Sequence, residues 1–192
     1  LPDGKLGIVV ADVADKGMGA ALFMALCRTL IRTYAYEYVQ GPEIALQAAN
    51  HRIVVDTEAD VFVTVFYGVL DPKTGTLTYC NAGHNPPYIM RRRNSKQGTI
   101  TRLTRTGVPL GLFAEYNGKA ATVELEPGDS LIVYTDGITE ARSPEGEEFG
   151  DPALQQVIIK NRWRPAREMH HAITRALQHF QQGAPLHDDI TL

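Results

Sequence analysis

The chain has 192 residues, of which 44% are hydrophobic, and a formal net charge of −3. This length suffices for a core without a disulfide framework, and the charge argues against a basic surface for nucleic acid. We interpret Cys27 and Cys80 as core thiols of a cytoplasmic protein, and we expect neither a signal peptide nor a membrane-spanning segment.

The first third of the chain reads as one strand and two helices. Residues 5–12, KLGIVVAD, are rich in β-branched side chains, which predicts a buried strand. From residue 18 to 38 the apolar side chains recur at spacings of three and four, which predicts a long amphipathic helix. The sequence GPE at 41–43 ends this helix and begins another, because proline suits the first helical turn.

The middle of the chain is dominated by strand patterns. Two of them flank DPKTG at 71–75, which predicts a β-hairpin. Further strands of the same meander are predicted at 86–91, 99–103 and 120–125. After a turn at 126–129, an apolar run ends on Asp136, a helical pattern follows from about residue 151, and 183–192 return to strand.

These elements indicate that residues 1–192 form a single domain. Short turns join consecutive strands, so the sheets are expected to be largely antiparallel, with helices packed on their outer faces. The cationic run RRRNSK at 91–96 is interpreted as a solvated loop between two strands.

Aspartates stand at the boundaries of three predicted strands. Asp12 and Asp136 end theirs, while Asp188 and Asp189 begin the last one. A strand that ends on an aspartate and an antiparallel neighbour that starts from one bring their carboxylates to the same edge of a sheet. Such carboxylates repel unless a cation neutralises them, and Mg²⁺ or Mn²⁺ suits a cluster of oxygen ligands. Two of these ions can activate water and hold a phosphate for in-line displacement.

Each of these residues also has a simpler interpretation. Asp12 and Asp15 could bond to backbone amides of the loop before the helix, and Asp136 could set a turn with the glycine that follows it. Glu140 could bind a metal-bound water or cap a turn. His84 could polarise a phosphate, although a loop histidine is the favoured interpretation. Only the joint pattern at three strand ends favours a metal centre.

Several segments resemble a known family in order and spacing. ADVADKG, NAGHNPP, VPLGLF, TDGITEA and HDDITL resemble the metal-dependent protein phosphatases of the PPM class, in the branch of the bacterial stage II sporulation protein E. This resemblance covers essentially the whole chain. It implies an α-β-β-α sandwich of two stacked antiparallel sheets, two Mn²⁺ or Mg²⁺ ions, and hydrolysis of phosphoserine or phosphothreonine in proteins by a metal-bridging water.

The resemblance also implies the site residues. Asp12 matches the catalytic aspartate that bridges both metals, and the backbone carbonyl of Val13 matches the neighbouring ligand. Asp136, the second catalytic residue, matches a ligand of one metal. Asp188 matches the last ligand, and Asp189 is a supporting or alternative ligand.

Two further expectations concern the segments that follow and precede Asp12. Gly17 and Gly19 are expected to let the chain turn tightly into the helix behind Asp12. The family carries another aspartate upstream, in a glycine-glycine-aspartate stretch, and residues 1–192 begin after that place; Asp3 lies in a turn and does not match it. We therefore expect a phosphatase domain truncated at both ends, and the activity of residues 1–192 alone stays open.

The implied function is that of a bacterial serine/threonine phosphatase in the cytoplasm, the output domain of a signalling protein with an upstream sensor domain. By resemblance, its substrate is a phosphorylated anti-anti-sigma factor. The protein could also form a homodimer. One alternative is a catalytically weak module that docks a phosphoprotein. Another is a metal-dependent phosphodiesterase or nuclease, which would carry more cationic surface than a chain of charge −3.

Overall fold

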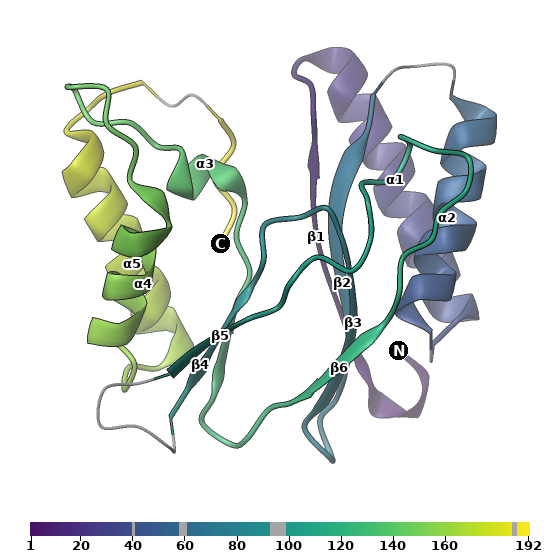
Figure 1. The fold of residues 1–192 in the computed structure, drawn as a ribbon, viewed down its shortest axis with the longest axis horizontal. Helices are drawn as coiled ribbons and strands as arrows, with labels where there is room; N and C mark the ends of the chain where they lie inside the picture. The colour runs from purple at the N-terminus through teal and green to yellow at the C-terminus, as the bar shows by residue number, and fades with distance from the viewer. Residues whose placement is uncertain (40, 58–60, 93–98, 186–187) are drawn as a thin grey trace. The chain divides into compact units, whose positions relative to one another are not determined.

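The computed structural model describes residues 1–39, 41–57, 61–92, 99–185 and 188–192. These residues divide into two compact units, each with one antiparallel sheet and helices of its own (Figure 1). Unit 1 comprises Leu1–His84 and Thr104–Leu125, and unit 2 comprises Asn85–Leu103 and Glu126–Leu192. The predicted α+β class with two antiparallel sheets is confirmed.

Unit 1 holds a four-stranded sheet with the order β1-β2-β3-β6. Its strands are β1 (Leu6–Val13), β2 (Val63–Asp71), β3 (Thr76–Ala82) and β6 (Ala121–Glu124). The predicted hairpin joins β2 and β3, and Gly75 in its turn has a φ of 77°. The prediction that 120–125 continue the meander is wrong: β6 pairs with β3, whereas β5 pairs with β4 in unit 2.

The helices of unit 1 cover one face of this sheet. A short 3-10 helix, η1 (Pro2–Gly4), precedes β1, and α1 (Met18–Glu37) and α2 (Pro42–Asp56) lie together against the strands (Figure 1). The predicted spacing is confirmed in α1, whose buried side chains join the core between helices and sheet. These buried residues are Ala20, Phe23, Cys27, Ile31 and Ala35.

The two glycines before and in α1 differ from each other. Gly17 has a φ of 95° and stands immediately before the helix, as predicted. Gly19 is the second residue of α1, so its prediction as a turn glycine is wrong.

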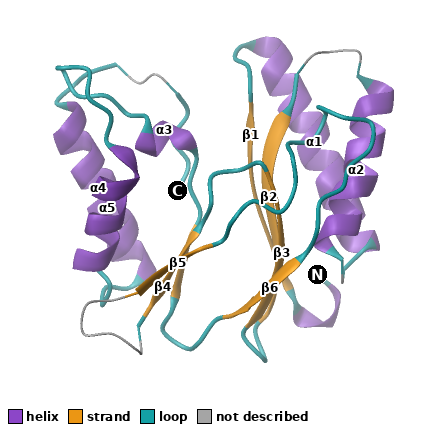
Figure 2. Cartoon of the chain, in the orientation of Figure 1, coloured by secondary structure: helices purple, strands orange, loops and turns teal. Residues whose placement is uncertain are grey.

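Unit 2 holds a three-stranded sheet with the order β5-β4-β7 and three helices among its described residues (Figure 2). The strands are β4 (Tyr88–Arg91), β5 (Thr99–Arg102) and β7 (Ser130–Ile132). The helices are α3 (Asp136–Thr139), α4 (Gly150–Lys160) and α5 (Ala166–Gln181).

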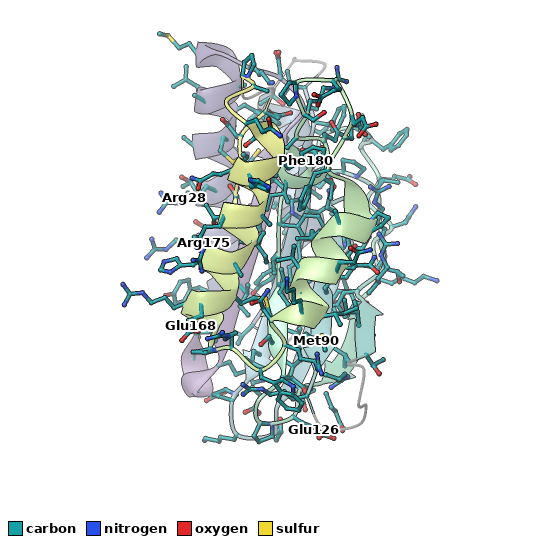
Figure 3. All side chains as sticks on the ribbon, turned by 90° about the vertical axis from the view of Figure 1, so that its left-hand side faces the viewer. Arg28, Met90, Glu126, Glu168, Arg175 and Phe180 are labelled. Atoms are coloured by element: carbon teal, nitrogen blue, oxygen red, sulfur yellow. The ribbon has the colours of Figure 1, made fainter. Side chains whose placement is uncertain are left out.

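The predicted helical face of α5 forms the core of unit 2. Met169, Ile173 and Leu177 are buried there, and the ring centroid of Phe180 lies 5.4 Å from that of Phe149. Charged side chains such as Glu168 and Arg175 extend from the exposed side of the helix (Figure 3). Among the described helices, none combines the length and the apolar character that crossing a bilayer requires.

Two local predictions are wrong, and a third is tested only at its first residues. β7 ends at Ile132, so Asp136 is the first residue of α3 and not the end of a strand. In the described part of the C-terminal segment, residues 188–192 form no strand. The cationic run at 91–96 begins inside β4, where Arg91 forms an ion pair with Asp129 at 2.7 Å, and its residues 93–96 lie outside the described residues.

Candidate functional site

Unit 1 contributes Asp12 and Val13, at the end of β1. Asp12 pairs with Thr64 of β2, and its neighbours Ala11 and Val13 pack against the core beneath the helices. Because successive strand residues point to opposite faces of a sheet, the half-buried Asp12 side chain lies on the face away from α1 and α2. The strand therefore interrupts its apolar run without placing a charge in the core.

The loop between β1 and α1 has partners of its own. The amide of Ala14 donates to the carbonyl of Phe62 at 3.0 Å, and that of Lys16 donates to Oδ1 of Asp15 at 2.8 Å. Asp15 is thus a turn residue, the simpler of its possible roles, and its carboxylate supports the loop behind Asp12.

A buried histidine lies beside this strand end. Nδ1 of His84 is 2.9 Å from Oγ1 of Thr64, and the same Oγ1 is 3.4 Å from the carbonyl oxygen of Asp12. His84 is 1% exposed, although it follows β3 in an irregular segment. Sequence reasoning treated it as a loop histidine and missed this contact. The available signal was its position, two residues after a strand and two residues before a pair of prolines that constrain the chain.

Unit 2 brings Asp136 next to the segment that carries Asp188 and Asp189. The hydroxyl of Thr135 donates to the carbonyl of Asp189 at 2.9 Å and accepts from the amide of Thr191 at 3.0 Å. The amide of Thr135 in turn donates to the carbonyl of Thr191 at 3.2 Å. The C-terminal segment is therefore tied to the start of α3 by hydrogen bonds around one threonine.

Carboxylates gather at this point of unit 2. Asp136 and Asp188 are half-buried, and the amide of Asp189 donates to Oδ1 of Asp188 at 2.8 Å. The pKa of Glu140 is raised by burial and then by the negative charges of Asp136, Glu148 and Asp188, against a smaller opposite effect of a nearby arginine. The carboxylates of Asp136, Glu148 and Asp188 therefore lie close enough to Glu140 to oppose its ionisation and raise its pKa.

One oxygen of Asp136 lacks a donor. Within the part of the chain that the structure describes, its Oδ1 is buried and has no hydrogen-bond partner. A buried carboxylate oxygen without a donor carries a desolvation cost, which a cation or a donor from a ligand would offset. The backbone carbonyl of Asp136, by contrast, has a partner, because it accepts from the amide of Glu140 at 2.8 Å.

The predicted site residues are thus distributed over the two units. Asp12 and Val13 belong to unit 1, and Asp136, Asp188 and Asp189 belong to unit 2. Across the described ranges, no group of three or more histidine, cysteine, aspartate or glutamate side chains is already arranged to hold a metal. The structure thus shows one set of these predicted residues in each unit, held by hydrogen bonds within that unit.

Known proteins are similar in sequence to this chain over nearly its whole length. It is 33% identical to the protein IcfG of Synechocystis sp. over 100% of this chain and 34% of that protein. It is 31% identical to the phosphoserine phosphatase RsbU of Bacillus subtilis over 98% of this chain and 54% of that protein. The chain therefore spans only part of the length of these curated relatives.

The fold is shared as well. The SiaA-PP2C domain of Pseudomonas aeruginosa superposes with a TM-score of 0.82, with 97% of this chain and 78% of that chain covered at 19% identity. A family model described as stage II sporulation protein E (SpoIIE) matches residues 2–192. The chain thus belongs to the stage II sporulation protein E family.

Proposed function

We propose that this chain is the catalytic domain of a metal-dependent protein phosphatase that hydrolyses phosphoserine or phosphothreonine. The observation that carries the proposal is the buried Oδ1 of Asp136, which has no donor among the described residues and lies near the carboxylates of Glu140 and Asp188. A divalent cation would neutralise this cluster. The relative that is named a phosphoserine phosphatase supports the reaction class.

The oxygen donors of this chain fit Mn²⁺ or Mg²⁺. In the proposal the carboxylates of Asp12, Asp136 and Asp188 and the carbonyl of Val13 hold two ions, with Asp189 as a supporting or alternative ligand. Carboxylate and carbonyl oxygens are the ligands that these hard cations prefer. When bound, the ions would supply the positive charge that activates water and stabilises the phosphoryl group.

The rest of the chain would keep these ligands in place. β1 holds Asp12 and Val13 in register with β2. The Thr135 hydroxyl holds the carbonyl of Asp189, and so keeps the C-terminal segment at the first turn of α3, where Asp136 lies. Within each unit, these bonds would hold the ligands in place before a cation arrives, which lowers the reorganisation needed on binding.

The substrate and context follow from the resemblance of the sequence. We propose a phosphorylated anti-anti-sigma factor as substrate, a cytoplasmic location, and an upstream sensor domain in the same polypeptide. The curated relatives are longer than the part this chain matches, which is consistent with additional domains in those proteins. A homodimer is compatible with this proposal.

The decisive experiment compares Asp136→Asn with wild type and with Asp71→Asn. Asp71 is a matched control, because its Oδ1 accepts from the amide of Lys73 in the hairpin turn, at 2.9 Å, and asparagine keeps that acceptor. Mn²⁺ binding is measured by calorimetry, and turnover is measured on a phosphoserine protein. We expect Asp136→Asn to lose metal affinity and turnover by on the order of 100-fold, with Asp71→Asn unchanged.

Other outcomes separate the alternatives. Tight Mn²⁺ binding without turnover, including in a chain extended upstream by about one strand, would favour the phosphoprotein-docking module. If wild type and Asp136→Asn bind Mn²⁺ equally well, Asp136 is not a ligand and the metal centre proposed here is wrong.

A further inference from the structure

The contact between His84, Thr64 and Asp12 restricts the directions that its two hydrogen bonds can take together. The Thr64 hydroxyl has one hydrogen, and it faces a carbonyl oxygen at 3.4 Å and a ring nitrogen at 2.9 Å. The Asp12 carbonyl can only accept, so a hydroxyl that serves both partners must give its hydrogen to Asp12 and accept from His84. Nδ1 of His84 must then carry a proton.

We propose that His84 is a positioning residue for the Asp12 end of the site and acts through Thr64. Its Nδ1–H donates to Oγ1 of Thr64, whose hydroxyl donates to the carbonyl of Asp12. The role assigned to this pair rests on the proposed function, in which Asp12 and Val13 supply metal ligands.

The backbone explains how this relay would act on the ligands. The carbonyl of Asp12 belongs to the peptide group that joins Asp12 to Val13, and that group is planar. A hydrogen bond to this oxygen therefore restrains the orientation of the whole peptide plane. This plane joins the α-carbons of Asp12 and Val13, so its orientation contributes to the relative direction of the two proposed metal ligands, the carboxylate of Asp12 and the carbonyl of Val13. Loss of this hydrogen bond would leave both metal ligands present but less well oriented.

The structure holds His84 itself firmly. Gly83 has a φ of 76°, and a Cβ added there would overlap the ring of Pro109, so glycine is required at this bend. Gly83 also forms a parallel bridge with Val65, the neighbour of Thr64 in β2. On the other side, Nε of Arg105 donates to the carbonyl of His84 at 3.4 Å. The ring therefore meets Thr64 from a braced segment of backbone.

A first measurement needs no metal and no substrate. Two-bond ¹H–¹⁵N spectra of the histidine rings report which nitrogen is protonated, and His84→Asn identifies the signal of His84 among the six histidines. We expect a proton on Nδ1 of His84 in the metal-free chain. A proton on Nε2 alone would overturn the relay, because Nδ1 would then accept from the Thr64 hydroxyl, whose hydrogen would no longer point to the Asp12 carbonyl.

A second measurement uses matched substitutions at the same position. The amide of asparagine places a donor near Nδ1, whereas the longer glutamine places it near Nε2. We expect His84→Asn to keep the Mn²⁺ affinity within about threefold, and His84→Gln to lower it by on the order of 10- to 100-fold. In turnover, kcat is expected to fall in His84→Gln with KM nearly unchanged. Equal affinities of the two variants at equal melting temperature would contradict the relay.

The partner residue provides an independent check. Thr64→Ser keeps the hydroxyl and Thr64→Val keeps the shape, so only Thr64→Val is expected to weaken Mn²⁺ binding. Wild-type affinity in Thr64→Val would overturn the proposal even if the histidine variants fold poorly. If wild type itself binds no Mn²⁺, the proposed function fails, while the tautomer of His84 still decides whether the relay exists.

Discussion

Unit 1 positions its acidic side chain by a regular strand ladder, whereas unit 2 positions its acidic side chains by hydrogen bonds between irregular segments. All eight residues of β1 pair with β2, and Asp12 takes its place from that register. In unit 2 the segments of Asp136 and Asp189 meet through the hydroxyl of Thr135. The difference teaches that strand register places Asp12 in the sheet, while the positions of Asp136 and Asp189 relative to each other depend on individual side chains.

The largest expected effect tests the close approach in unit 2. A Cβ at Gly137 would overlap the carbonyl oxygen of Asp189, so Gly137→Ala should push the C-terminal segment away. We expect a loss of about 2 kcal/mol in the free energy of unfolding, measured in urea, and weaker Mn²⁺ binding. Gly19→Ala in α1 is the control, because an added Cβ there meets nothing within 4 Å and alanine favours the helix. Equal stability of the two variants would remove the distinction between the units.

An intermediate effect tests the polar network of unit 2. Oδ1 of Asp151 accepts from the hydroxyls of Tyr88 at 2.7 Å and Tyr134 at 3.0 Å, and its carboxylate pairs with Arg102. Burial raises the pKa of Asp151, but the two hydroxyls and the arginine outweigh it, so the pKa is lowered. The charged carboxylate therefore stabilises the fold above about pH 4, its unfolded value, and this contribution is lost as pH falls through the folded pKa.

We therefore expect Asp151→Asn to cost about 1 kcal/mol at pH 7, a figure discounted for the partial exposure of the carboxylate. The difference from wild type should shrink when unfolding is measured near pH 3. A difference that is the same at both pH values would show that the charge does not matter and that only the shape of Asp151 does.

The smallest expected effect tests whether a buried hydroxyl group in unit 1 contributes to stability. Tyr67 is fully buried, its hydroxyl has no hydrogen-bond partner in the described part of the chain, and burial raises its pKa to about 12. Tyr67→Phe should leave the free energy of unfolding unchanged or raise it by less than about 1 kcal/mol, because an unpaired polar atom is removed. Tyr116→Phe, which loses a hydroxyl 3.2 Å from Sγ of Cys80, should lower it instead. A loss in Tyr67→Phe as large as in Tyr116→Phe would show that unit 1 also depends on polar contacts.

The sequence predicted what local periodicity determines. It placed β1, α1, the hairpin of β2 and β3, and the buried face of α5, since each follows from the spacing of apolar residues. It did not predict that β6 returns to β3, because pairing between distant segments leaves no trace in the spacing of either one.

The candidate site followed the same division. An end of β1 near Asp12 was predictable from the apolar run before it, and the strand ends one residue later, at Val13. The strand expected up to Asp136 stops at Ile132, and the final strand is replaced by bonds to Thr135. Such bonds depend on one hydroxyl group and leave no repeating pattern in the sequence from which they could be predicted. The burial of His84 was missed for a similar reason, since its partner Thr64 is distant in the chain.

The strand ladder that carries Asp12 also limits how the length of this protein can vary. Ala11 and Val13 face the core formed with α1, and Asp12 faces the other way. Deletion or insertion of a single residue within β1 would exchange the two faces and drive the carboxylate toward Cys27 and Ile31, where an unpaired charge is strongly unfavourable. Changes of two residues would preserve the facing of every side chain. Among functional descendants of this sequence, β1 should therefore gain or lose residues only in even numbers.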